Sequence, residues 1–292
     1  MQLESLLLAL MLTHVPPGKT QFSVQPAEQS EATTWSDFYG SWVERETPAH
    51  AEKRYASIAA AFRAEAEALL CRTFDGKDID DCEPHPEAVD GSGAPRWTPL
   101  DLSLLSLAVA IQESGLREDV QVGRGSAKKP SQDGGRGRGP GGEACLMQIH
   151  PTISWRVADV DEELRRKAKG GDRQAREAIL KTLVGRDSQA LRHCIRAGMR
   201  TLIRGRAHCA WAKPRQAWDI AAVSIFATGI GCDPDSSGKV MRRVLLYRKL
   251  RVQAASLRRA PPEPKEQAPG SGESAVYFPH FAPRARILRA AA

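Results

Sequence analysis

The sequence has few of the features that mark several large protein classes. Its longest N-terminal apolar run, Leu6 to Leu12, is far shorter than the roughly 20 residues that a helix needs to cross a bilayer. The 7 histidines form no HExxH pair, and no Ser-His-Asp order stands out. Strand-like alternation of apolar and polar residues is scarce. We therefore expect a mainly helical chain without a transmembrane segment, a metal site or another cofactor.

The six cysteines are scattered and lack the CxxC spacing of a structural zinc site, so disulfides in an exported protein are the favoured interpretation. Cys71 and Cys82 would close a short local loop. A bond between Cys194 and Cys209 is disfavoured, because a continuous helix would separate them by about 22 Å. The remaining pairing is open. We expect a periplasmic or extracellular location.

The apolar run near the N-terminus resembles the h-region of a signal peptide only weakly. Glu4 stands where positive residues are expected, and no A-x-A cleavage site follows. A short amphipathic helix is the alternative interpretation of this run. With 42 basic against 35 acidic side chains, the net charge of +7 suits a negatively charged partner such as cell wall, nucleic acid or anionic lipid.

Composition divides the chain into four segments. Residues 1–47 form an N-terminal segment with a weak signal or tail character, and residues 48–97 form a helical preface that ends in a Pro- and Gly-rich loop. Residues 98–255 carry the main domain. Residues 256–292 are rich in Pro, Gly and basic residues and predict a disordered tail.

The main domain begins with a strongly marked helix. Thr98 has N-cap chemistry, Pro99 fits the first helical position and Gly115 offers a stop. The residues between are apolar on nearly every side, which predicts a buried helix. Glu113 therefore lies at its C-terminal end, where desolvation and the negative helix terminus both raise the pKa of a carboxyl group.

Further helices are expected along the rest of the domain. Residues 159–184 predict a charged, exposed helical region, and an amphipathic helix with an arginine stripe from Arg192 to Arg204 is expected to stop at Gly205. Such a stripe is usually solvated and paired with acids. Helices over 218–226 and 240–250 follow, and a small hairpin is allowed between Val120 and Ile149.

Four motifs in order resemble the lytic transglycosylases of the SLT type. They are IQESG from Ile111, CLMQIHP from Cys145, CIRAGMRTLI from Cys194 and FATGIG from Phe226, and Tyr247 lies on the expected final helix. The resemblance covers about residues 98–251. It implies a lysozyme-like α+β domain that acts on the glycan strands of peptidoglycan as a monomer, without nucleic acid.

The resemblance also assigns roles to single residues. It makes Glu113 the catalytic acid, which protonates the leaving oxygen and then takes a proton from the muramic acid C6 hydroxyl to give a 1,6-anhydro end. It assigns the glycan groove to a set of residues beside this acid: Ser114, Met147, Gln148, Phe226, Thr228, Gly229 and Tyr247.

Several departures from the family pattern keep alternatives open. Cys145 replaces a Gly, Phe226 a Tyr and Ala227 an Asn, and the basic segment 123–142, with eight glycines and five Lys or Arg, lengthens the interval to Gln148. The alternatives are an inactive glycan-binding module and a hydrolytic lysozyme. A lysozyme would use a second carboxylate, for which the sequence offers three acids that are expected to be solvated or in turns: Asp119, Asp133 and Glu143.

Two other segments admit ligand-binding interpretations. The GRGRGPGG stretch could bind RNA, although a plain flexible loop is favoured. The aromatic cluster from Trp35 to Trp42 could stack on sugars, although anchoring the N-terminal segment is the favoured role.

Overall fold

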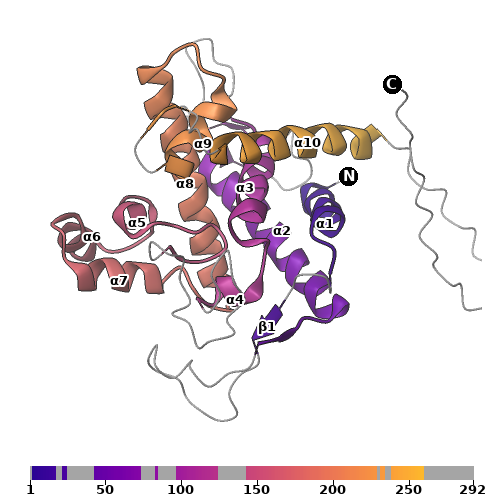
Figure 1. The fold of residues 1–292 in the computed structure, drawn as a ribbon, viewed down its shortest axis with the longest axis horizontal. Helices are drawn as coiled ribbons and strands as arrows, with labels where there is room; N and C mark the ends of the chain where they lie inside the picture. The colour runs from indigo at the N-terminus through magenta and orange to yellow at the C-terminus, as the bar shows by residue number, and fades with distance from the viewer. Residues whose placement is uncertain are drawn as a thin grey trace, which may run out of the picture. The chain divides into compact units, whose positions relative to one another are not determined.

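The computed structural model describes residues 2–17, 22–24, 43–73, 83–84, 97–123, 143–228, 231–233 and 238–259. Over these residues the chain is mainly helical, as expected (Figure 1). The helices are α1 (Leu3–His14), α2 (Pro48–Leu70), α3 (Pro99–Ser114), α4 (Glu118–Gln121), α5 (Pro151–Val157), α6 (Glu162–Lys169), α7 (Arg173–Lys181), α8 (Ser188–Ala212), α9 (Trp218–Thr228) and α10 (Lys239–Arg259).

Strands make only a small contribution in the described ranges. β1 (Phe22–Val24) pairs antiparallel with β2 (Val43–Arg45), and β3 (Cys71–Thr73) pairs with β4 (Glu83–Pro84). Where a hairpin was allowed between Val120 and Ile149, the described residues form α4 and one isolated bridge between Ala144 and Ile149. The aromatic cluster and the Gly-rich segment 124–142 lie outside the described residues.

Helix α3 begins and ends where the sequence predicts. The Thr98 hydroxyl oxygen accepts the backbone N–H of Asp101 at 3.0 Å, which satisfies one of the free donors of the first turn. At the other end Gly115 takes φ 61°, and its N–H bonds to the Ile111 carbonyl at 3.0 Å. Figure 1 shows α10 crossing α3, and the two helices pack together.

Helix α1 belongs to the same apolar core as the main domain. Its side chains Leu6, Leu7, Leu10 and Met11 are at most 1% exposed, and the helix packs on α2 and α10. Burying each such side chain contributes about 1.5–3 kcal/mol. The run that resembles an h-region is therefore a core helix of the fold. Among the described residues, no helix is long and apolar enough to span a membrane.

Helix α8 continues past the expected stop at Gly205, so that prediction was wrong. A Cβ atom at Gly205 would lie 2.6 Å from the Ala222 carbonyl oxygen of α9, so glycine permits the close approach of two helices. The helix ends only at Ala212, before Lys213 and Pro214. A residue that precedes proline is disfavoured in the helical region, and Lys213 accordingly takes φ −139°.

Other boundaries shift more modestly. The charged region expected over 159–184 is divided into α6 and α7 at Gly170 and Gly171, and the second glycine takes φ 98°. Helix α10 extends to Arg259, so residues 256–259 are helical where a tail was predicted. Residues 260–292, which hold the rest of that tail, lie outside the described part.

Two disulfides are defined, and both involve α8. Cys145 bonds to Cys194 and Cys209 bonds to Cys232. The expectation that Cys194 and Cys209 are not joined is confirmed. Cys71 is also disulfide-bonded, while Cys82 lies outside the described residues. For loops closed over 49 and 23 residues, chain entropy favours the folded state by roughly 3–4 kcal/mol per bond.

Candidate active site

Glu113 occupies the last turn of α3, as predicted, and is held by an arginine from α10. Its side chain is 16% exposed. The Arg243 guanidinium donates from Nε to Glu113 Oε1 at 2.9 Å and donates a second bond to the same oxygen from Nη2. Within the described part of the chain, Oε2 has no hydrogen-bond donor. Arg243 thus fixes one oxygen of the carboxyl group and not the other.

Burial and an ion pair act on the pKa of Glu113 in opposite directions. Burial is the largest influence and raises the pKa of Glu113, whereas Arg243 lowers it and the nearby charge of Glu143 raises it again. The net direction is upward, so the predicted raised pKa is confirmed. A carboxyl group of this kind keeps its proton to higher pH than an exposed glutamate does.

Sequence reasoning did not identify Arg243. Its side chain is 10% exposed, and it shares a face of α10 with the buried Val240, Val244 and Tyr247 at helical spacing. An arginine on an apolar face requires a partner of opposite charge. That spacing was the available signal, but it does not reveal which acid is the partner.

Ser114 stabilises the turn after α3. Its hydroxyl donates to the Ala110 carbonyl at 2.8 Å and accepts the N–H of Leu116 at 3.1 Å, and the side chain is buried. Gly115 and Leu116 both take positive φ, at 61° and 55°. The serine therefore fixes the direction in which the chain leaves the helix beside Glu113.

Met147 and Gln148 lie in the turn that the Ala144–Ile149 bridge closes. Met147 is fully buried, and a Cβ at Gly198 of α8 would lie 2.7 Å from its Cγ. Gln148 is 9% exposed and donates from Nε2 to the Cys145 carbonyl at 2.8 Å. Met147 packs the turn against α8 and Gln148 closes it internally, and their assignment to a glycan groove stays a prediction.

Cys145 explains one departure from the family pattern. Its φ is 64°, in the left-handed region that glycine adopts freely and that costs other residues about 1–2 kcal/mol. The disulfide to Cys194 ties this residue to α8. The position therefore still has the backbone conformation of a glycine, and a covalent bond holds it there.

A buried glutamine organises the same turn from the other side and was missed by the sequence reasoning. Gln121 of α4 accepts the Leu146 N–H on Oε1 at 3.2 Å and donates from Nε2 to the carbonyls of Leu183 and Gly185. It thereby joins the segment after α3 to the turn that carries Met147. Nothing in its local sequence marks it.

The remaining residues assigned by resemblance lie in different surroundings, and one of them is outside the described residues. Phe226 and Ala227 are partly buried on α9 against the core, Thr228 ends that helix, and Gly229 lies outside the described residues. Tyr247 is 1% exposed, and its hydroxyl donates to Asp101 Oδ1 at 2.8 Å. Its ring also packs edge-on against Trp218, at 5.5 Å between centroids. In this structure Tyr247 joins α10 to the start of α3.

Of the three candidates for the second carboxylate of a hydrolytic lysozyme, Glu143 is placed near Glu113, since its charge raises the pKa of Glu113. Asp119 is fully buried in α4, contrary to the solvated position expected for it. Burial raises the pKa of Asp119 to about 6. Asp133 lies outside the described residues.

One group of side chains brings together donor atoms that metals use. Atoms of Glu46, His50 and Glu118 lie within 4.8 Å of one another. Arg54 Nε lies 2.8 Å from Glu46 Oε1, and Arg186 Nε lies 3.5 Å from Glu118 Oε1. Because the two carboxylates already have cationic partners, this group is better described as an ion-pair network that joins α2 to α4.

No family model, curated protein or solved structure matches the chain.

Proposed function

We propose that the chain is a lytic transglycosylase of lysozyme-like fold, which cleaves the bond between N-acetylmuramic acid and N-acetylglucosamine in peptidoglycan. The main observation that supports the proposal is the environment of Glu113. It is a desolvated carboxyl group at the end of a buried helix, and Arg243 holds one of its oxygens. The ordered sequence motifs supply the substrate class, because a raised pKa alone fits many acids.

The proposed reaction uses one carboxyl group twice. Protonated Glu113 donates its proton from Oε2 to the glycosidic oxygen, and the bond from that oxygen to muramic acid C1 breaks. The resulting carboxylate takes the proton of the muramic acid C6 hydroxyl, whose oxygen bonds to C1 and closes the 1,6-anhydro ring. No water is consumed. Between the two steps, Arg243 stabilises the carboxylate through Oε1.

The second candidate is a hydrolytic lysozyme of the same fold, and the position of Glu143 favours it. A carboxylate near the acid can activate a water or stabilise the charge that develops on the sugar. Hydrolysis would place a water oxygen on C1 and leave a reducing end. The two reactions therefore differ in the mass of their products by one water.

Mass spectrometry of soluble products from purified peptidoglycan tests the proposal. Disulfides are kept oxidised, and Glu113→Gln is the inactive comparison, checked for folding by circular dichroism. Anhydro-muropeptides from the wild type alone are expected. Reducing ends would identify a lysozyme, and wild-type binding without any product would reassign the chain as a glycan-binding module.

A further inference from the structure

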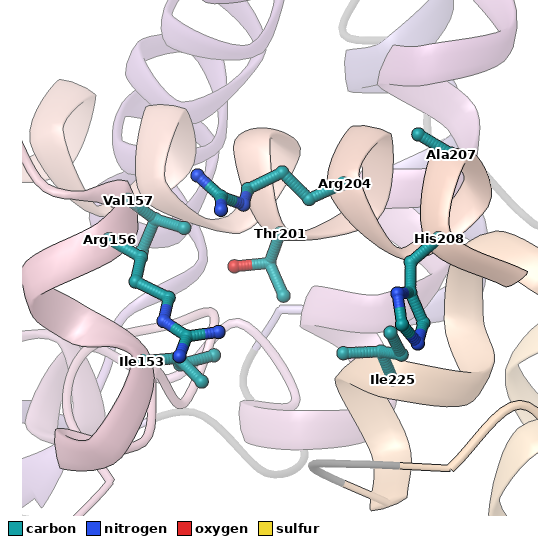
Figure 2. Close-up of a pocket in the computed structure, with 8 residues that line it drawn as sticks. All are labelled: Ile153, Arg156, Val157, Thr201, Arg204, Ala207, His208 and Ile225. Atoms are coloured by element: carbon teal, nitrogen blue, oxygen red, sulfur yellow. The ribbon is translucent and has the colours of Figure 1, made fainter.

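A pocket of about 490 Å³ lies between α5, α8 and α9, within the size range of small-molecule sites. It is lined by Ile153, Arg156, Val157, Thr201, Arg204, Ala207, His208 and Ile225. Figure 2 shows Arg156 and His208 on opposite sides of this space, with Thr201 between them. The pocket is thus surrounded by two kinds of side chain. Apolar side chains come from α5 and α9, and exposed cationic or ionisable side chains come from α5 and α8.

Among the described residues, no carboxylate balances the positive charge of this pocket. On the same arginine stripe of α8, Arg192 and Arg196 pair with Glu65, and Arg196 and Arg200 pair with Asp159. Arg204 has no carboxylate partner in the described ranges. Neither does Arg156, which stacks on the Trp155 ring at 4.6 Å from its centroid. Two guanidinium groups at one cavity without an acid favour an anionic ligand.

An exposed tryptophan continues the same surface. Trp211 is 84% exposed and follows Arg204 and His208 at helical spacing on α8. Other indole rings are packed: Trp97 and Trp218 meet edge-on at 5.0 Å between centroids. A bare indole presents a flat apolar face of the kind that stacks on a sugar ring. Its place on α8, one turn after the pocket-lining His208, points to a ligand that joins a ring to an anion.

We infer that this surface binds a saccharide that bears a carboxylate, with the sugar ring on Trp211 and the carboxylate between Arg156 and Arg204. The inference rests on the proposed function, which supplies the source of such a ligand: the peptide stems of peptidoglycan place carboxylates beside N-acetylated sugars. Bidentate guanidinium contacts favour a planar carboxylate. The pocket would thereby select glycan that carries peptide over bare glycan.

The test measures binding by calorimetry and tryptophan fluorescence in a Glu113→Gln background, where no turnover occurs. The probes are muramyl dipeptide, which has one free carboxylate, and its neutral amidated form. Substituting both Arg156→Gln and Arg204→Gln should weaken binding of the acid at least tenfold and leave the amide unchanged. Arg173→Gln, at the exposed start of α7, removes one arginine charge away from the pocket and, as the control, should change neither.

The fluorescence change should disappear in Trp211→Phe. Equal affinity for acid and amide, or equal losses in Arg173→Gln and the double variant, would overturn the inference. Displacement of the acid by a single-stranded oligonucleotide of higher affinity would overturn it in favour of nucleic-acid phosphate. Anhydro products without any effect of the arginines would refute this site alone, and arginine-dependent binding without wild-type turnover would refute the proposed enzyme alone.

Discussion

Two acids flank the turn at Gly115 and Leu116, and they differ in what they can do. Glu113 lies in the last turn of α3 and Asp119 lies in α4, and burial is the largest influence on each, raising both pKa values. By this property alone they are equivalent. A search for acids with perturbed pKa values would select both.

Their surroundings separate them. Asp119 is fully buried, and its Oδ1 lies 3.3 Å from Nε of Arg117, which is itself buried. Glu113 is partly exposed, and Arg243 engages only one of its oxygens. Burial therefore sets the tendency to hold a proton, whereas access decides whether that proton can reach a ligand. We assign the chemistry to Glu113 and a structural role to Asp119 on this ground.

Replacing each acid by its isosteric amide should give the largest difference in turnover between the two positions. Glu113→Gln should lower peptidoglycan turnover by about a hundredfold to ten-thousandfold, the usual contribution of a general acid. Asp119→Asn should retain turnover, because its carboxyl group is closed off from any ligand. Initial rates of product release on the two variants measure this. Equal losses from two equally folded variants would contradict the division of roles.

The pH dependence of stability should isolate Asp119. Its folded pKa of about 6 lies above the unfolded value of about 3.9, so its favourable contribution is complete below pH 4 and is lost as pH rises through 6. Two pKa units correspond to about 2–3 kcal/mol. In denaturant titrations, the loss of unfolding free energy between pH 4 and pH 7 should be smaller in Asp119→Asn than in the wild type by this amount. An unchanged difference between the two pH values in that variant would refute the assignment.

The sequence predicts those parts of this region that depend on local chemistry. Thr98, Pro99 and Gly115 act through neighbours along the chain, so both ends of α3 could be placed, and the position of Glu113 followed. Gly205 shows the limit. Glycine ends α3 at Gly115 through its backbone freedom, whereas at Gly205 it lets α8 pass close to α9. Only the packing distinguishes these two roles.

Contacts between distant segments could not be predicted. Arg243 reaches Glu113 across 130 positions and Gln121 reaches Leu183 across 62, and neither distance leaves a local pattern. Resemblance assigns Tyr247 to the glycan groove, which stays a prediction, but it did not predict the hydrogen bond from Tyr247 to Asp101. The arginine stripe was expected to be solvated and paired with acids, and three of its members do have acidic partners, but the sequence did not show which acids these are or that Arg204 lines a pocket. Pairing in space, which periodicity does not encode, decided each case.

The turn between the two acids can be strained without disturbing a contact. Gly115→Ala places a Cβ that would meet only Arg117 Cγ, at 3.9 Å, but it forces a side chain into φ 61°. The expected cost is about 1–2 kcal/mol of unfolding free energy. Gly170→Ala, at a glycine with ordinary φ of −69°, is the control and should cost less. Equal costs by denaturant titration would show that the backbone angle at 115 is not the constraint.

The smallest effect should come from Arg243, because its removal leaves the acid in place and acts on turnover through the stability of the Glu113 carboxylate. Arg243 lowers the pKa of Glu113, so Arg243→Gln should raise it. A general acid acts while protonated, and the alkaline limb of the pH profile of turnover should therefore move to higher pH. Arg243→Lys, which keeps the charge, should restore part of the wild-type profile, a rescue that a purely packing role would not give. An acidic limb that moves to higher pH in Arg243→Gln, with the alkaline limb unchanged, would mean that Glu113 acts as a base in the rate-limiting step.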